Sequence, residues 1–255
     1  MTASPTPPAV PFQLRFRDLT LGYERHPAIH HLDGGIAEGT LLAVCGRNGA
    51  GKSTLMKAIA GVLRPLSGAI DRAGLDPKDI AYLPQGAEVD RSFPISVYDM
   101  VSMGLWRRAG LFGGIGKADR ARIADAIAAV GLEGFETRPI GTLSGGQMQR
   151  TLFARLLLQD ARLILLDEPF TALDAKTVAD LLQLVQRWHG ERRTVLAVLH
   201  DFDLVRTHFP QTLLLARTAV AWGPTAEVLA PENLLRARRM GEAWPADSGP
   251  CEAAA

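Results

Sequence analysis

Short runs of consecutive apolar residues recur along this chain and alternate with segments in which apolar residues return every three or four positions. The clearest runs are residues 41–45, 163–166, 194–199 and 212–215. A strand that is apolar on both of its faces is typical of a parallel sheet covered on both sides. The alternation therefore predicts an α/β fold with a mainly parallel sheet.

The segments between these runs carry the spacing of amphipathic helices. One stripe contains Val178, Leu181, Leu182, Val185 and Trp188, and another contains Ile123, Ile127 and Val130. Residues 54–60 predict a further helix, which ends at Gly61. Ordinary core packing accounts for these stripes, so we assign no ligand to them.

One stretch departs from the alternation. Residues 86–142 contain helical patterns and a glycine-rich loop, but no convincing strand pattern. We therefore expect a mainly helical subdomain, at about residues 86–160, inserted into a single domain that spans residues 12–245. Residues 1–11 are rich in proline and small residues, and residues 246–255 are small and polar, so both ends predict disordered tails.

The charge, the cysteines and the lengths of the apolar runs limit the partners and the cell compartment that fit this sequence. The 255 residues carry a formal net charge of only +1, so we expect no nucleic-acid partner. The two cysteines, Cys45 and Cys251, do not make a disulfide framework, so a reducing compartment fits. No signal peptide opens the sequence, and the longest apolar candidate, residues 212–222, is too short to cross a membrane. A role at a membrane would need another subunit to cross the bilayer.

A glycine-rich segment, residues 46–53, joins the predicted strand at 41–45 to the predicted helix at 54–60. It fits the pattern G-x-x-x-x-G-K-S in the strand-turn-helix context that this pattern requires. Its glycines, which allow consecutive N–H groups to converge on phosphate oxygens at the positive end of a helix, are Gly46, Gly49 and Gly51. Lys52 adds a mobile charge, and the hydroxyl of Ser53 suits Mg²⁺. The segment predicts a site for a nucleoside triphosphate with Mg²⁺.

Two adjacent carboxylates follow the apolar run at 163–166. Ligands of doubly wound folds bind at the carboxyl ends of such strands. Asp167 is suited to holding Mg²⁺ through its water shell, and Glu168 to polarising the water that attacks the γ-phosphate. A positioned general base typically contributes about 10²–10⁴ in rate, so turnover should depend most sharply on Glu168.

A second glycine-rich segment, residues 143–147, stands at the start of another predicted helix and has no lysine of its own. Together with the phosphate loop and the carboxylates, it makes the sequence resemble the ATP-binding subunits of ABC transporters from about residue 12 to residue 240. The resemblance implies a P-loop core with an inserted helical subdomain and antiparallel strands near the N-terminus. The ATP contacts that it implies in the phosphate loop are Gly46, Asn48, Gly49, Gly51, Lys52, Ser53 and Thr54.

Four single residues match the same family in register. Tyr23 corresponds to the aromatic residue that stacks on adenine, and Gln85 to the glutamine that joins the two subdomains and can reach Mg²⁺ or the attacking water. Asp174 ends the loop after the carboxylates. His200 corresponds to the histidine near the γ-phosphate, where it could distinguish ATP from ADP. Arg47 and the residue before His200 depart from the family pattern without removing a ligand.

The resemblance also implies a head-to-tail homodimer. The signature segment of one copy would cover the γ-phosphate held by Lys52 of the second copy. The residues expected at this contact are Ser144, Gly145, Gly146 and Gln147. A helix N-terminus supplies roughly half a positive charge, which favours a bound triphosphate but is insufficient as a lone site. ATP would then join the subunits, and hydrolysis would release them.

Residues 91–106 and 167–171 are similar to bacterial importers of zinc and manganese, and less closely to importers of iron chelates such as siderophores or haem. This likeness implies integral-membrane permease subunits as partners and a periplasmic or surface solute-binding protein as an indirect partner. It also implies a position at the cytoplasmic face of the bacterial inner membrane. Residues 89–98 are expected to form the groove that receives a permease helix, with burial in the core as an equal alternative for Phe93 and Val97.

Two other interpretations stay open. A soluble ABC-type ATPase of cluster assembly is one alternative, whereas the sequence lacks the long coiled-coil insertion of repair ATPases and the N-K-x-D motif of GTPases. A metal site at His26, His30 and His31 is the other. Because no cysteine or carboxylate pattern accompanies these histidines, we interpret them as exposed loop residues.

Overall fold

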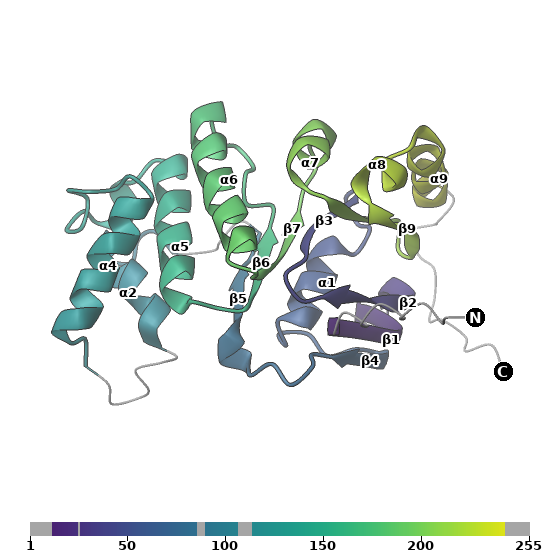
Figure 1. Cartoon of the computed structure of the whole chain (residues 1–255), viewed down its shortest axis with the longest axis horizontal. Helices are drawn as coiled ribbons and strands as arrows, with labels where there is room; N and C mark the ends of the chain where they lie inside the picture. The colour runs from purple at the N-terminus through teal and green to yellow at the C-terminus, as the bar shows by residue number, and fades with distance from the viewer. Residues whose placement is uncertain (1–11, 25, 86–89, 107–113, 243–255) are drawn as a thin grey trace, which may run out of the picture.

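The computed structural model of this protein describes residues 12–24, 26–85, 90–106 and 114–242. The tails predicted at residues 1–11 and 246–255 lie outside the described residues. The described residues form two sheets that enclose one helix, with further helices on the outer face of the larger sheet and at one end of the molecule (Figure 1).

The large sheet has the strand order β5-β6-β7-β3-β8-β9, in which β9 alone runs antiparallel to its neighbour. Its strands are β3 (Leu41–Gly46), β5 (Ile80–Leu83), β6 (Leu163–Asp167), β7 (Thr194–Val198), β8 (Gln211–Leu215) and β9 (Ala219–Pro224). Strands β6 and β7 are buried throughout, which is why their sequences are continuous apolar runs. The prediction of a mainly parallel sheet is confirmed.

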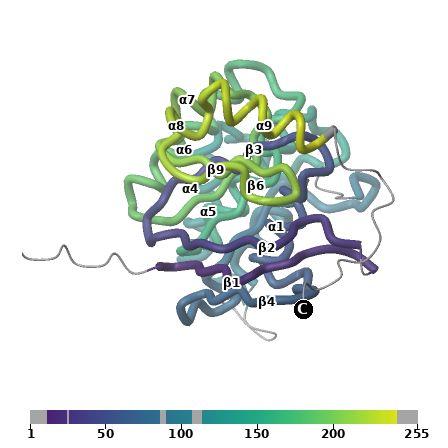
Figure 2. Tube along the Cα trace, turned by 90° about the vertical axis from the view of Figure 1, so that its right-hand side faces the viewer, coloured from purple at the N-terminus to yellow at the C-terminus, as the bar shows by residue number. Residues whose placement is uncertain are grey.

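The small sheet is antiparallel and has the order β2-β1-β4. Its strands are β1 (Phe12–Tyr23), β2 (His26–Ala37) and β4 (Ser67–Asp71). Helix α1 (Lys52–Ile59) lies between the two sheets, as Figure 1 and Figure 2 show from perpendicular directions. Leu55, Met56 and Ile59 of this helix are buried in the core that both sheets share. The core therefore fixes the start of α1, and with it the phosphate loop, against β3.

The elements described between residues 97 and 159 are all helical and lie at one end of the molecule (Figure 1). They are α2 (Val97–Ser102), the short 3₁₀ helix η2 (Met103–Leu105), α4 (Lys117–Ala129), η3 (Ile140–Thr142) and α5 (Gly145–Gln159). Ile123 and Ile127 of α4 pack into the same buried cluster as Leu152 and Phe153 of α5. The apolar stripe expected around residue 123 is thus a core stripe.

The remaining helices complete the molecule. They are η1 (Pro77–Asp79), which precedes β5, and α6 (Ala175–Gly190), α7 (Phe202–His208), α8 (Thr225–Val228) and α9 (Pro231–Glu242). Helices α6 to α9 lie on the face of the large sheet opposite α1 (Figure 1). No helix in the described parts of the chain is both long and apolar enough to cross a membrane.

The interpretation of three histidines as exposed loop residues is corrected by the fold. His26, His30 and His31 all lie on β2, because this segment pairs with β1 across its whole length. The side chain of His30 is buried against the core, with 7% of its surface exposed. Within the described ranges, no three His, Cys, Asp or Glu side chains gather as a metal site would require.

Candidate functional site

Three neighbouring parallel strands bring the phosphate loop, the two carboxylates and His200 to one edge of the large sheet. Strand β7 lies between β6 and β3, and all three run in the same direction. The phosphate loop follows β3, the two carboxylates lie at the end of β6, and His200 follows β7. Segments that are more than a hundred residues apart in the chain therefore meet where doubly wound folds bind their ligands.

The backbone of the phosphate loop needs glycine at its ends. Gly46 has φ +153° and Gly51 has φ +92°, angles that residues with a side chain rarely adopt. A Cβ atom at Gly46 would clash with the carbonyl of Leu215, and one at Gly51 would clash with Ile29. The loop is therefore packed so closely between β8 and β2 that larger residues do not fit at these two positions.

Lys52 holds this loop in shape. Its Nζ donates hydrogen bonds to the carbonyl oxygens of Gly46 at 2.9 Å and Arg47 at 3.0 Å. Burial lowers the pKa of the Lys52 ammonium, while the nearby carboxylates of Glu168 and Asp167 oppose that shift. A cation that curls back over the loop in this way is placed to contact the phosphates of a nucleotide.

Three oxygen donors lie together beside Lys52. The hydroxyl of Ser53 donates to Oδ1 of Asp167 at 3.0 Å, and its oxygen lies 3.4 Å from Oε1 of Gln85. Asp167 is 1% exposed, and this burial raises its pKa, against the opposing hydrogen bond from Ser53. Hydroxyl, carboxylate and amide oxygens are the hard ligands that Mg²⁺ prefers, so these residues fit a Mg²⁺ ion that accompanies a nucleotide.

Glu168 stands at the turn that leaves β6. Its φ of +52° lies in the left-handed region, which is uncommon for a residue other than glycine. Its Oε1 is 2.6 Å from Nε2 of His200, and its Oε2 accepts a 3.4 Å hydrogen bond from the hydroxyl of Thr171. The carboxylate is therefore held on both oxygens at the mouth of the site.

A cavity of about 610 Å³ joins these groups. It is lined by Ala28, Asn48, Gly49, Gly51, Lys52, Ser53, Thr54, Gln85, Glu168, Thr171 and His200. Its size is in the range of small-molecule sites. Ala28 and Thr171 were not among the predicted site residues. Thr171 lies in the loop already noted after the carboxylates, whereas nothing in the local sequence marked Ala28.

Tyr23 lies outside this lining, at the end of β1. The residue is 48% exposed, and Nζ of Lys57 lies 6.0 Å from the ring centre. An exposed aromatic ring with a cation beside it can accept a flat π-system such as a base. Its role in binding adenine stays a prediction.

The second glycine-rich segment forms the N-terminus of α5 and does not line the cavity. Ser144 caps this helix through a hydrogen bond from the N–H of Gln147, and the Gln147 side chain accepts from the N–H of Ser144. Gly145 faces open space, since a Cβ there would meet nothing within 4 Å. Asp174 likewise caps α6, accepting from the N–H and the hydroxyl of Thr177. The structure thus places both predicted contacts outside the cavity of their own chain.

This fold and this site define a nucleoside-triphosphate-binding protein of the phosphate-loop class. The sequence profile described as "ABC transporter" matches residues 29–171. Curated relatives share about two fifths of their residues with this chain over nearly the whole length, so the chain belongs to the ATP-binding proteins of the ABC transporter family. Such proteins bind nucleotides, form dimers and work with membrane permeases.

Two of these relatives are named for metal transport. The zinc transport system ATP-binding protein TroB of Treponema pallidum (strain Nichols) is 40% identical over 233 residues, which cover 90% of this chain and 88% of TroB. The manganese transport system ATP-binding protein MntB of Bacillus subtilis (strain 168) is 39% identical over 227 residues, which cover 88% of this chain and 91% of MntB.

Solved structures agree on the fold. An inward-facing metal-chelate type ABC transporter matches with a TM-score of 0.79 and 31% identity, over 90% of each chain. The cbiO1 protein of Clostridium perfringens, part of the ABC transporter complex cbiONQ, matches with a TM-score of 0.72 and 26% identity, over 91% of this chain and 98% of its own.

Proposed function

We propose that this protein hydrolyses ATP to drive the import of a divalent metal, zinc or manganese. The observation that supports ATP hydrolysis is the meeting of Lys52, Glu168 and His200 around one cavity at the edge of a parallel sheet. Asp167 lies directly behind the lining of this cavity, hydrogen-bonded to Ser53. The relatives named for zinc and manganese transport support zinc or manganese as the transported metal. The metal-chelate type transporter supports metal chelates, among which we include iron chelates, as a second candidate cargo.

ATP binding would use the phosphate loop and the oxygen donors beside it. Backbone N–H groups of the loop and the ammonium of Lys52 would hold the phosphates. Ser53, Asp167 and Gln85 would hold Mg²⁺, which neutralises charge on the phosphate oxygens. Burial of Asp167 favours its protonated form, so a cation in the site would also keep this carboxylate ionised.

Hydrolysis would begin when Glu168 orients a water molecule toward the γ-phosphate. In its present geometry Glu168 is hydrogen-bonded to His200 instead. A γ-phosphate oxygen would be a second acceptor for the His200 ring, and ADP lacks that oxygen. His200 would then leave Glu168 for the γ-phosphate only when ATP is bound.

A second copy of the chain would complete the site. The N-terminus of α5 is exposed at Ser144 and Gly145 and lies outside the cavity of its own chain. Placed over the ATP of a second copy in a head-to-tail dimer, it would add its partial positive charge to the γ-phosphate.

A permease would dock on the helical end of the molecule. Phe93 is 59% exposed and Trp106 is 63% exposed, whereas Val97 is fully buried in the core. Exposed aromatic side chains of this size are typical of interaction sites, so the groove proposed for residues 89–98 would present Phe93 and not Val97 to the permease. The protein would work peripherally, at the cytoplasmic face of the bacterial inner membrane, and reach a solute-binding protein only through the permease.

Transport by reconstituted vesicles tests this function. The chain and the permease that copurifies with it are placed in vesicles. Uptake of labelled zinc ions, manganese ions and iron chelates is then measured in the presence of ATP. We expect uptake of zinc or manganese, and none with Glu168→Gln in place of the native chain. Uptake of an iron chelate alone would contradict the proposed cargo, and ATP-independent uptake would contradict the proposed role.

A further inference from the structure

The signature helix α5 contacts the segment that follows the catalytic carboxylate of its own chain. Nε2 of Gln149 donates a 2.8 Å hydrogen bond to the carbonyl oxygen of Pro169, the residue directly after Glu168. One turn further along α5, the ring of Phe153 stacks on Phe170, with ring centres 6.5 Å apart and planes at 26°. Two residues of one helix face therefore hold the two residues that follow Glu168.

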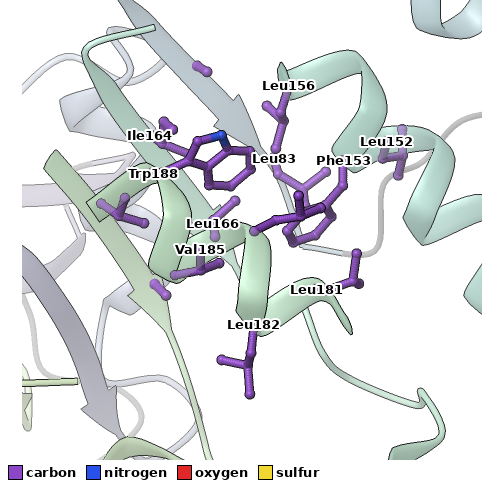
Figure 3. Packing of buried hydrophobic residues seen from close by; sticks show 14 of the residues in the cluster. Leu83, Leu152, Phe153, Leu156, Ile164, Leu166, Leu181, Leu182, Val185 and Trp188 are labelled. Atoms are coloured by element: carbon purple, nitrogen blue, oxygen red, sulfur yellow. The ribbon is translucent and has the colours of Figure 1, made fainter. Parts of the chain in front are cut away.

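The same helix is fixed to the start of α6. Arg150 on α5 forms a 2.6 Å ion pair with Asp180, and its Nη2 lies 3.4 Å from the hydroxyl of Thr177. Thr177 in turn bonds to the capping residue Asp174. Phe153 also stacks on Trp188 of α6, with ring centres 5.8 Å apart and planes at 10°; Figure 3 shows both rings within this buried cluster. Helices α5 and α6 are therefore joined near the start of α6, which follows the loop that carries Glu168, and again near its end.

The conformation of Glu168 depends on such support. Its left-handed backbone is unfavourable for a residue with a side chain, and such conformations persist only where the surroundings hold them. Pro169 has no N–H, so its carbonyl is the backbone hydrogen-bonding group through which a neighbour can fix it. Gln149 makes that bond.

We propose that Gln149 is a positioning residue for ATP hydrolysis, which sets the carboxylate of Glu168 through Pro169. Because the helix of Gln149 begins at Ser144, the position of Glu168 in each chain also depends on whether its signature segment is engaged on the ATP of the second copy. This coupling rests on the head-to-tail dimer of the proposed function. It makes each active site sensitive to nucleotide in the other.

Steady-state kinetics of Gln149→Met test the coupling, because methionine keeps the volume of the side chain and removes its donor. Loss of one hydrogen bond that acts on the transition state corresponds to about a fivefold to tenfold fall in kcat. We expect that fall, with KM for ATP changed by less than about twofold and a lower Hill coefficient for ATP. Gln149→Glu, which has the shape of glutamine but sets an acceptor against the carbonyl oxygen of Pro169, should lower kcat at least as far.

Gln186→Met is the matched control. Nε2 of Gln186 donates a 2.9 Å hydrogen bond to the carbonyl oxygen of His208, so the control loses a bond of the same kind away from the site. An equal fall of kcat in the control, or native kcat in both Gln149 variants, would overturn the proposal. If the native chain itself hydrolysed no ATP and Glu168→Gln formed no ATP-dependent dimer, the proposed function would fail instead.

Discussion

His200 Nε2 lies 2.6 Å from Glu168 Oε1, so the histidine after β7 is hydrogen-bonded to the carboxylate at the end of β6. The Glu168 side chain is 12% exposed and the His200 side chain is 40% exposed, which leaves the histidine accessible from the cavity. The pair therefore lies in the lining of the cavity proposed to bind the nucleotide. Its two members are expected to respond differently to substitution.

Replacing Glu168 by glutamine should stop turnover but keep ATP binding. Glutamine retains the size of the side chain and cannot accept a proton from water, so we expect kcat to fall by about 10²-fold or more. Without hydrolysis, the dimer should persist as long as Mg-ATP is present. Size-exclusion chromatography with and without Mg-ATP measures this, and a monomer under both conditions would contradict the dimer.

Replacing His200 by alanine should remove the preference for ATP over ADP. A hydrogen bond from histidine to a charged phosphate is typically worth about 1.5–3 kcal/mol, which corresponds to a fall in affinity for the ATP analogue of about 10-fold to 100-fold. Affinity for ADP, which lacks the γ-phosphate, should not change. Calorimetric titrations with ADP and a non-hydrolysable ATP analogue measure both effects. His26→Ala, an exposed histidine on β2, is the control that should leave both unchanged.

The strands and the phosphate loop could be predicted because their signals are local. Residues 41–46 and 163–167 form fully or almost fully buried strands, and a run of apolar residues is enough to mark them. The helix around residue 123 follows from its spacing, and it packs against α2 and α5 at the helical end. In these segments the local pattern and the fold agree.

Contacts across the fold could not be predicted in the same way. The bond from Gln149 to Pro169 depends on how α5 packs beside the end of β6, and neither residue carries a spacing that marks the contact. The burial of His30 depends on the register between β1 and β2, which contains several irregularities. Such features follow from tertiary packing, so a local sequence pattern does not contain them.

Cys45 should resist alkylation in the folded protein. Burial in β3 raises the pKa of its thiol to about 12, so the reactive thiolate is absent near neutral pH. We expect no modification of Cys45 by iodoacetamide at about pH 8 in the native chain, and complete modification after unfolding in guanidinium. Mass spectrometry of the peptide that contains Cys45 measures both. Modification in the native state would contradict the buried position.

The same thiol should make the protein less stable in alkali. Its pKa is raised in the folded state from an ordinary value of 9.0, so the unfolded chain loses this proton first as the pH rises. The free energy of unfolding should therefore fall between about pH 9 and about pH 12. Cys45→Ala should show a smaller fall over that interval, measured by urea denaturation at each pH.

Gly34 allows the small sheet to contact the large one. It has φ +140°, and a Cβ there would lie 2.6 Å from the ring of Trp222 on β9. The centre of this ring also lies 6.0 Å from the ring centre of Phe16 on β1. Gly34→Ala should therefore lower the free energy of unfolding by ~1–3 kcal/mol. Gly190→Ala is the control, since a Cβ there meets nothing within 4 Å. Equal stability of the two variants in urea would contradict a close contact at Gly34.

Ser144 is expected to act on the ATP of the second copy and not on that of its own chain. Two inactive variants, Lys52→Ala and Ser144→Arg, distinguish these cases when they are mixed. In a head-to-tail dimer of the two, one site keeps both a native Lys52 and a native Ser144 from opposite chains. In an equal mixture, half of the dimers contain one chain of each variant, and each of these dimers has one intact site of its two. Activity should therefore return to at most about a quarter of the native value.

The reverse combination is the control for this mixture. A chain that carries both Lys52→Ala and Ser144→Arg, mixed with the native chain, leaves no intact site in the mixed dimer, so only the native homodimers should hydrolyse ATP. If Ser144 acted on its own chain, the results would be exchanged. The two single variants would not complement each other, whereas a dimer of the double variant and the native chain would keep one working site. ATPase rates of the two mixtures therefore decide which chain Ser144 serves.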